Sequence, residues 1–222
     1  MTAMAAESIA QLTCAVVLAG GRGSRMGGVD KGLQSFRGHT LVQQALQRLQ
    51  KQSAGAPGLI GINANRHLDS YVALGVPVWR DATADYAGPL AGFLAGLHAC
   101  NSPKAHYSYM LTVPCDSPLF PLDLLERLAK ALTDTGVDIA MASAPESNPD
   151  GTTTLRRQPV FCLVKTSLFS SLQQFVDGGG SKIFAWVQQH TYSEVPFDRA
   201  DDVANAFFNA NTLAQLQHLE QS

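Results

Sequence analysis

A glycine-rich segment near the N-terminus combines the residue types that bind phosphate. Residues 20–32 read GGRGSRMGGVDKG and contain six glycines together with Arg22, Arg25 and Lys31. Glycine lets the backbone turn sharply and bring its N–H groups close to an anion. Cationic side chains in the same segment neutralise the charge of a bound phosphate. The segment therefore predicts a phosphate-binding loop, with a solvated surface loop as the alternative.

This segment follows neither of two common phosphate-binding patterns. It has no Gly-Lys-Ser/Thr, so it is not a Walker A loop. The run that starts at Gly21 reaches Met26 where a dinucleotide fingerprint requires glycine or alanine. The second apolar run of the chain also leads to Asn63, not to the acidic residue that would hold a ribose.

A single acidic residue, Asp116, follows a long apolar run and lies between Pro114 and Pro118. Proline restricts the backbone, so the two prolines favour a turn that directs the carboxylate away from the end of a strand. Mg²⁺ prefers one or two carboxylates together with phosphate oxygens and water. Asp116 is therefore the candidate metal ligand, and an N-cap role for a following helix is the alternative.

The elements that must position these residues alternate between strand and helix. Apolar runs predict strands at residues 14–18, 59–62, 77–79, 107–113, 138–142, 159–165 and 191–196. Amphipathic runs predict helices at residues 41–52, 67–74, 89–100 and 121–133, with further helical segments after residues 165 and 196. The polar residues 146–154 read as an exposed loop. This alternation predicts an α/β, three-layer, Rossmann-like fold with a mainly parallel central sheet.

Polar or glycine-rich residues follow four of the predicted strands. Ligands of such sheets bind beyond the carboxyl ends of the strands. One crevice should therefore be lined by the glycine-rich loop, Asn63, Asp81 and Asp116. Asn63 and Asp81 are alternatively turn residues that bond to their own backbone.

Composition narrows the class of protein. The chain has 222 residues, a length that suits one domain over residues 14–222. Its net charge of −2 offers no broad basic surface to nucleic acid. We expect residues 1–13 to form a disordered leader, and the apolar runs are too short to span a membrane. The four cysteines form no CxxC pair and read as buried, reduced thiols. These features favour a cytoplasmic protein.

Several motifs together resemble the small nucleotidyltransferases, and most closely the molybdenum cofactor guanylyltransferases. The first three lie in the loop and read Leu18-Ala19-Gly20-Gly21, Arg25-Met26-Gly27 and Asp30-Lys31-Gly32-Leu33. The others read Asn63-Ala64-Asn65-Arg66-His67, Asp85-Tyr86-Ala87-Gly88-Pro89-Leu90-Ala91-Gly92, Pro114-Cys115-Asp116-Ser117-Pro118 and Asn209-Ala210-Asn211-Thr212. They occur in the family's order over about residues 14–216.

The resemblance implies a nucleotidyltransferase fold and transfer of GMP from GTP to molybdopterin, either free of molybdenum or already carrying it. It implies Mg²⁺ on Asp116 and three catalytic residues, Lys31, Arg25 and Asp116. The residues implied to bind the nucleotide are Leu18, Ala19, Gly20, Gly21, Lys31, Asn63, Asp81 and Asp116. It further implies contact with other proteins of molybdenum cofactor biosynthesis and with recipient molybdoenzymes.

Two other functions remain open from the residues. One is a cytidylyltransferase for the same pterin or a sugar-like phosphate; those enzymes typically have Leu-Ala-Ala-Gly where this chain has Leu18-Ala19-Gly20-Gly21. The other is a nucleotide sensor without catalysis. A sensor has no need to keep both Lys31 and Asp116, and both are present here.

Overall fold

The computed structural model describes residues 9–21, 30–82, 88–102, 107–148, 150–203, 205–210 and 212–221. A seven-stranded sheet with the order β5-β4-β1-β6-β8-β7-β9 forms its centre. The strands are β1 (Thr13–Leu18), β4 (Leu59–Asn63), β5 (Val78–Trp79), β6 (Tyr109–Pro114), β7 (Ile139–Ser147), β8 (Thr153–Lys165) and β9 (Tyr192–Pro196). Two further short strands, β2 (Ser35–Phe36) and β3 (His39–Thr40), pair with each other in a separate hairpin.

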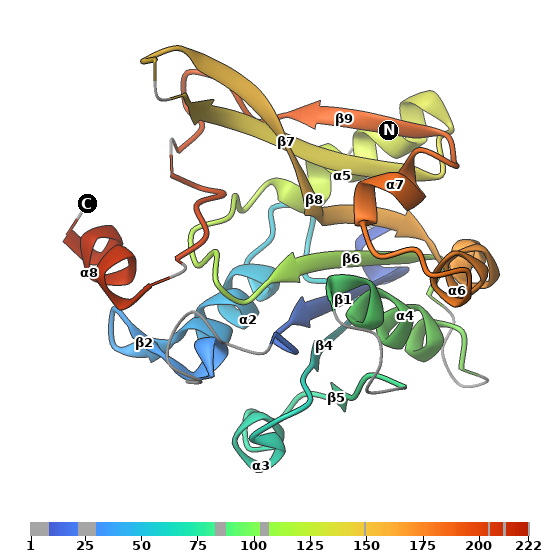
Figure 1. Ribbon diagram of the computed structural model, residues 1–222, viewed down its shortest axis with the longest axis horizontal. Helices are drawn as coiled ribbons and strands as arrows, with labels where there is room; N and C mark the ends of the chain where they lie inside the picture. The colour runs from blue at the N-terminus through green and yellow to red at the C-terminus, as the bar shows by residue number, and fades with distance from the viewer. Residues whose placement is uncertain are drawn as a thin grey trace.

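The sheet is mainly parallel, as the sequence predicted. Strand β1 pairs in parallel with β4 and β6, β4 pairs in parallel with β5, and β7 pairs in parallel with β9. Strand β8 runs antiparallel to both of its neighbours, β6 and β7. The predicted α/β fold class is therefore confirmed (Figure 1).

Helices cover both faces of this sheet. On one face α2 (Leu41–Gln50) and α5 (Leu124–Thr135) enclose a core that includes Ala15 and Val17 of β1. On the other face α4 (Pro89–Cys100), α6 (Phe169–Asp177) and α7 (Ile183–Val187) enclose Cys14 and Val16. Because successive strand residues point to opposite faces, a strand buried on both sides reads as a continuous apolar run.

Local sequence signals explain where several helices begin and end. Thr40 and Gln43 form a reciprocal capping box at the start of α2. Pro89 occupies the first turn of α4, where its missing N–H costs no hydrogen bond. Helix α5 ends at Gly136, which has a left-handed φ of 71°. The described chain also contains α3 (Leu68–Val72), α8 (Leu213–Gln221) and two 3₁₀ turns, η2 (Lys31–Leu33) and η3 (Thr166–Leu168).

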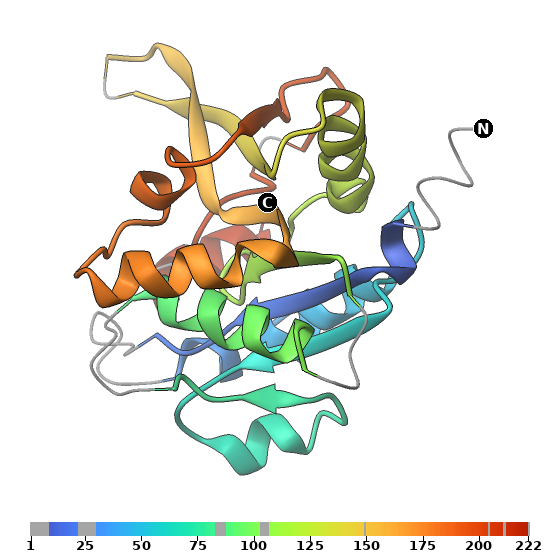
Figure 2. The same cartoon turned by 90° about the vertical axis from the view of Figure 1, so that its right-hand side faces the viewer.

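The loop predicted at residues 146–154 is wrong in extent. Strands β7 and β8 continue through most of it as a hairpin, in which Ser147 pairs with Thr153. Strand β7 ends at Ser147 and β8 begins at Thr153, and between them the N–H of Gly151 bonds to the carbonyl of Asn148. This hairpin extends beyond the rest of the sheet (Figure 2), so its polar residues are exposed and show no apolar alternation.

The chain is ordered upstream of the predicted domain start at residue 14. Ile9 is 8% exposed and Ala10 is fully buried, and both belong to the core that α2 encloses. The Ala10 carbonyl accepts a hydrogen bond from Gly58 N, and the Thr13 hydroxyl donates to the Ile9 carbonyl. The predicted leader therefore extends too far toward the C-terminus. The apolar stretch around Ile9 and Ala10 is too short to indicate by itself that it packs against the core.

No helix in the described part of the chain is long and apolar enough to cross a membrane.

Candidate active site

The four strands whose following residues were predicted to line one crevice end side by side at the carboxyl end of the parallel strands. Neighbouring parallel strands β5, β4, β1 and β6 end together, with Trp79 opposite Asn63, Asn63 opposite Leu18, and Leu18 opposite Pro114. In Figure 1 the arrowheads of β1 and β6 point to the same side of the molecule. The residues that follow these strands therefore lie side by side and form what we call the crevice.

Lys31 and Asp116 form an ion pair in this crevice although 85 positions separate them. The Nζ atom of Lys31 lies 3.1 Å from Oδ2 of Asp116, and the two side chains are 20% and 18% exposed. Lys31 is the first residue of η2, and Asp116 follows β6. The pair brings a cation and a carboxylate, each partly open to solvent, to the end of the central strands.

A buried hydrogen bond lies under the Lys31 turn. Asp30 is 6% exposed and Tyr71 of α3 is fully buried. The Tyr71 hydroxyl donates to Oδ1 of Asp30 at 2.5 Å, and the same oxygen accepts from Gly32 N at 3.1 Å. Burial, and then the hydrogen bond to Asp30, raises the pKa of Tyr71, so its hydroxyl keeps its proton. Sequence reasoning gave Tyr71 no role, because nothing in a five-residue helix marks one.

Three polar side chains form a second network at the ends of β4 and β5. The amide nitrogen of Asn63 donates to Oδ1 of Asp81 at 2.8 Å, and that of Asn65 donates to Oδ2 at 2.7 Å. The backbone N–H of Asp81 returns a bond to Oδ1 of Asn65 at 2.9 Å. The Asn63 side chain is 3% exposed, so the Asp81 carboxylate is held by a donor that is itself buried. Asn65 lies in the Asn63–His67 motif, but the sequence pattern does not predict its bonds to Asp81.

Glycines pack tightly around Asn63. A Cβ atom on Gly20 would lie 2.9 Å from Oδ1 of Asn63, and one on Gly92 would lie 2.6 Å from the same atom. Real Cβ atoms essentially never approach other atoms within 3.0 Å, and the added atoms would also lie 2.9 Å from Nδ2 of Asn65 and 2.6 Å from a methyl of Leu18, respectively. A larger residue at either position would therefore displace the side chains around it. The start of the glycine-rich loop is therefore seated directly on the network that holds Asp81.

The residues before the loop are tied to their neighbours by backbone bonds. Ala19 N donates to the carbonyl of Asn63, and the carbonyl of Leu18 accepts from Cys115 N. The guanidinium of Arg66 donates to the carbonyl of Gly21 at 3.1 Å. Residues 22–29 are not among the described residues, so the predicted Arg25 lies outside the part of the chain that the structure describes.

The turn that carries Asp116 is held by the C-terminal part of the chain. The buried Ser117 hydroxyl donates to Oδ1 of Asn209 at 2.6 Å, and Ala210 N donates to the carbonyl of Asp116. Helix α5 begins at Leu124, with Asp123 at its N-cap position. Asp116 therefore does not cap that helix, which removes the alternative role considered for it.

Cysteine chemistry finds no support in this crevice. All four cysteines are free and buried, as the sequence predicted. Burial, and then the charge of Asp116, raises the pKa of Cys115, so its thiol is a poor nucleophile. Among the described residues, no group of three or more His, Cys, Asp or Glu side chains gathers to hold a metal.

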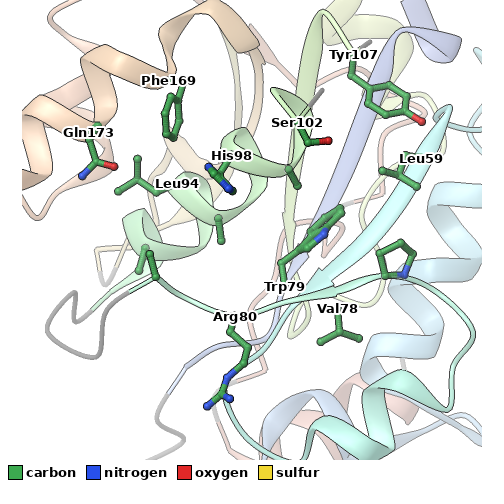
Figure 3. A pocket seen from close by; sticks show the side chains of 15 residues that line it. Leu59, Val78, Trp79, Arg80, Leu94, His98, Ser102, Tyr107, Phe169 and Gln173 are labelled. Carbon is green, nitrogen blue, oxygen red and sulfur yellow. The ribbon is translucent and has the colours of Figure 1, made fainter. Parts of the chain in front are cut away.

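A cavity lies beside the crevice and does not include its residues. It has a volume of about 830 Å³ and lies between β5 and the helices α4 and α6. Figure 3 shows Trp79 in its wall, with Leu94 and His98 of α4 and Phe169 of α6 across from it. Lys31, Asn63, Asp81 and Asp116 do not line it. The polar groups thus converge at the strand ends, and the cavity is an apolar hollow at the edge of the sheet.

Comparison with known proteins agrees with this geometry. Residues 15–194 match the MobA-like NTP transferase domain. A relative from Acidovorax sp. (strain JS42), named molybdenum cofactor guanylyltransferase, is 57% identical over 92% of this chain and 93% of its own. A relative of the same name from Albidiferax ferrireducens is 54% identical over 96% of this chain and 98% of its own.

A solved structure shows the same fold. Molybdopterin-guanine dinucleotide biosynthesis protein A from Archaeoglobus fulgidus superposes with a TM-score of 0.70, covering 94% of this chain and 97% of its own. Its sequence identity is 20%, so this likeness concerns the fold alone. Taken with the family match and the curated relatives, the chain belongs to the MobA-like NTP transferase family and is a nucleotidyltransferase.

Proposed function

We propose that the chain transfers GMP from GTP to the terminal phosphate of molybdopterin and releases pyrophosphate. The observation that carries the proposal is the crevice itself. It contains the Lys31–Asp116 ion pair and also the Asp81 carboxylate, which the side-chain amides of two asparagines hold in place. The first group suits a triphosphate and the second suits a base that offers N–H donors. Relatives named molybdenum cofactor guanylyltransferase support the choice of donor and acceptor.

The reaction joins two anions, so charge repulsion is its main obstacle. A phosphate oxygen of the acceptor attacks the α-phosphorus of GTP, and the bond to the pyrophosphate oxygen breaks in line. The attacking phosphate is already ionised at neutral pH and needs no general base. The ammonium of Lys31 offsets the negative charge that gathers on the phosphates, and the glycine backbone near Gly20 and Gly21 holds them.

Asp116 has the properties of a magnesium ligand. It is a single, partly exposed carboxylate at the strand ends, and a cation, the Lys31 ammonium, already lies 3.1 Å from its Oδ2 atom. Mg²⁺ typically takes one or two carboxylates and completes its shell with water and phosphate oxygens. When bound, Mg²⁺ would neutralise phosphate charge and orient the triphosphate. We propose Asp116 as its ligand and Arg25 as a further phosphate contact.

Asp81 is suited to read guanine. The Watson–Crick edge of guanine presents N–H donors, and a carboxylate can accept from two of them. Asn63 and Asn65 each donate to one oxygen of Asp81 and leave further acceptor capacity on both. We therefore propose that Asp81 contacts the base and that Asn63 keeps it in place. We also propose that the acceptor already carries molybdenum, that the protein acts in the cytoplasm, and that it meets other molybdenum cofactor proteins there.

The test is a nucleotide screen followed by an assay of transfer. We expect GTP with Mg²⁺ to raise the melting temperature more than ATP, CTP or UTP. Ligand at about a hundred times its dissociation constant adds roughly 2.7 kcal/mol of stability. We also expect pyrophosphate release from GTP only when molybdopterin is present. A larger shift with CTP would favour the cytidylyltransferase, and GTP binding without pyrophosphate release would favour the sensor.

A further inference from the structure

Tyr71 lies beneath the crevice on α3, a helix that carries none of the proposed binding residues. Its side chain is fully buried, and its hydroxyl donates to Oδ1 of Asp30 at 2.5 Å. A buried hydroxyl that pairs with a buried carboxylate is a costly arrangement unless both groups are satisfied. The contact therefore fixes α3 and the end of the glycine-rich loop relative to each other.

Asp30 connects this contact to Lys31. The same Oδ1 atom accepts the N–H of Gly32, so Asp30 caps η2, the turn whose first residue is Lys31. The carbonyl of Asp30 accepts from the side-chain amide of Gln34 at 2.9 Å. Asp30 thus holds the turn by its side chain and by its backbone, and Tyr71 holds Asp30.

Close packing leaves the turn little freedom to move. A Cβ atom on Gly32 would lie 2.5 Å from the Tyr71 hydroxyl oxygen. The backbone of the turn therefore rests directly on Tyr71. The side chain of Lys31 therefore extends to Asp116 from a backbone that is held in place.

We propose that Tyr71 is a positioning residue that acts through Asp30 to hold Lys31 against Asp116. The proposal rests on the proposed function of the crevice and adds to it a residue outside the crevice. Lysine has a long flexible side chain, so the position of its ammonium depends on how firmly its backbone is held. Small misplacements of a group that stabilises a transition state can cost large factors in rate.

The first experiment compares Tyr71→Phe with Tyr107→Phe. Both changes remove one hydroxyl that donates a hydrogen bond, since Tyr107 donates to the Gly58 carbonyl at 3.4 Å. Tyr107 and Gly58 precede β6 and β4, at the opposite edge of the sheet. We expect Tyr71→Phe to lower kcat roughly tenfold or more, with little change in KM for GTP. The control should keep kcat, and an unchanged kcat in Tyr71→Phe would overturn the proposal.

The second experiment does not depend on the reaction. A water-soluble amine-reactive ester labels lysines, and mass spectrometry gives the rate at each position. We expect Lys31 to be labelled faster in Tyr71→Phe than in the unaltered protein, because its pairing with Asp116 loosens. Lys165, paired with Asp138 at 3.1 Å, is the internal reference and should not change. If the unaltered protein makes no dinucleotide, the proposed function fails while labelling still decides the role of Tyr71. Equal labelling of Lys31 in both proteins contradicts that role.

Two changes at Asp30 cover the case in which Tyr71→Phe does not fold. Asn at this position keeps an oxygen that can accept from both Tyr71 and Gly32, whereas Ala keeps none. We therefore expect Asp30→Asn to retain more of kcat, and slower labelling of Lys31, than Asp30→Ala. Equal losses in the two variants would show that the charge of Asp30, not its hydrogen bonds, matters, and would overturn the proposal.

Discussion

Two Lys–Asp pairs with the same N···O separation lie at opposite ends of the sheet. Lys31 and Asp116 meet at 3.1 Å where the central parallel strands end. Lys165 and Asp138 also meet at 3.1 Å, at the end of β8 and directly before β7. Because β8 is antiparallel to its neighbours, this second pair belongs to the edge where the parallel strands begin.

The surroundings of the two pairs differ. Asp138 also accepts from the Thr191 hydroxyl at 2.6 Å, and Lys165 also donates to the Gly136 carbonyl at 3.2 Å. Thr191 and then Lys165 lower the pKa of Asp138 by these hydrogen bonds. At the crevice, Lys31 is the only side chain among the described residues that donates to the Asp116 carboxylate. The two pairs have equal distances, but the Asp116 carboxylate accepts fewer hydrogen bonds from described side chains than the Asp138 carboxylate does. Asp116 is therefore the better candidate for a metal ligand.

The largest effect should separate the two aspartates. Asp116→Asn keeps the shape of the side chain and removes its charge, so we expect turnover to fall on the order of 10³-fold or more. Asp138→Asn makes the same change at the other pair and should leave turnover intact. Assays of pyrophosphate release measure the turnover of both variants, and melting curves check that each one is folded. Full activity in Asp116→Asn would rule out Asp116 as an essential ligand.

The two lysines should differ next. Lys31→Ala removes a cation that follows charge toward the leaving pyrophosphate, so we expect kcat to fall on the order of 10²-fold. Loss of an interaction made in the transition state lowers kcat and kcat/KM together. Lys165→Ala should keep kcat. Steady-state kinetics with GTP varied at saturating acceptor measure both, and a change in KM alone for Lys31→Ala would contradict the assigned role.

A smaller effect should appear at Asp81, a crevice carboxylate held by two amides and not by a lysine. Asp81→Asn would remove the charge that accepts N–H donors from guanine. We expect the ratio of kcat/KM for GTP to that for ITP, which lacks the exocyclic amine, to fall roughly tenfold. Competition between the two nucleotides measures this ratio. An unchanged ratio would place base recognition on other residues.

The smallest effect concerns acid stability at the structural pair. The pKa of Asp138 lies below its ordinary value of 3.8, so the stabilisation is complete above that pH and is lost as pH falls through the lower folded-state pKa. The pair is about one-third exposed, so we expect a contribution below about 1 kcal/mol. Urea unfolding at several pH values should show a smaller acid-induced loss in Asp138→Asn. An identical loss in both proteins would show that the pair contributes nothing measurable.

The sequence by itself determined the fold class and the main outline of the crevice. Fully apolar runs such as residues 14–18 can only be strands or helices buried on every side, and the helical runs between them require a layered sheet. The carboxyl ends of neighbouring parallel strands lie side by side, so the sequence alone predicts that Asn63, Asp81 and Asp116 lie together. These conclusions depend on local patterns and on one general rule of sheet geometry.

Only the tertiary structure decided how these residues are held. The direction of β8 and the length of its hairpin depend on pairing with β7, and polar exposed strands leave no apolar alternation to predict them. The bond from Tyr71 to Asp30 and the bonds from Asn65 to Asp81 join positions 41 and 16 apart. Such contacts depend on where side chains meet in space, and hydrogen bonds have strict limits of distance and angle. No periodicity along the chain carries that information.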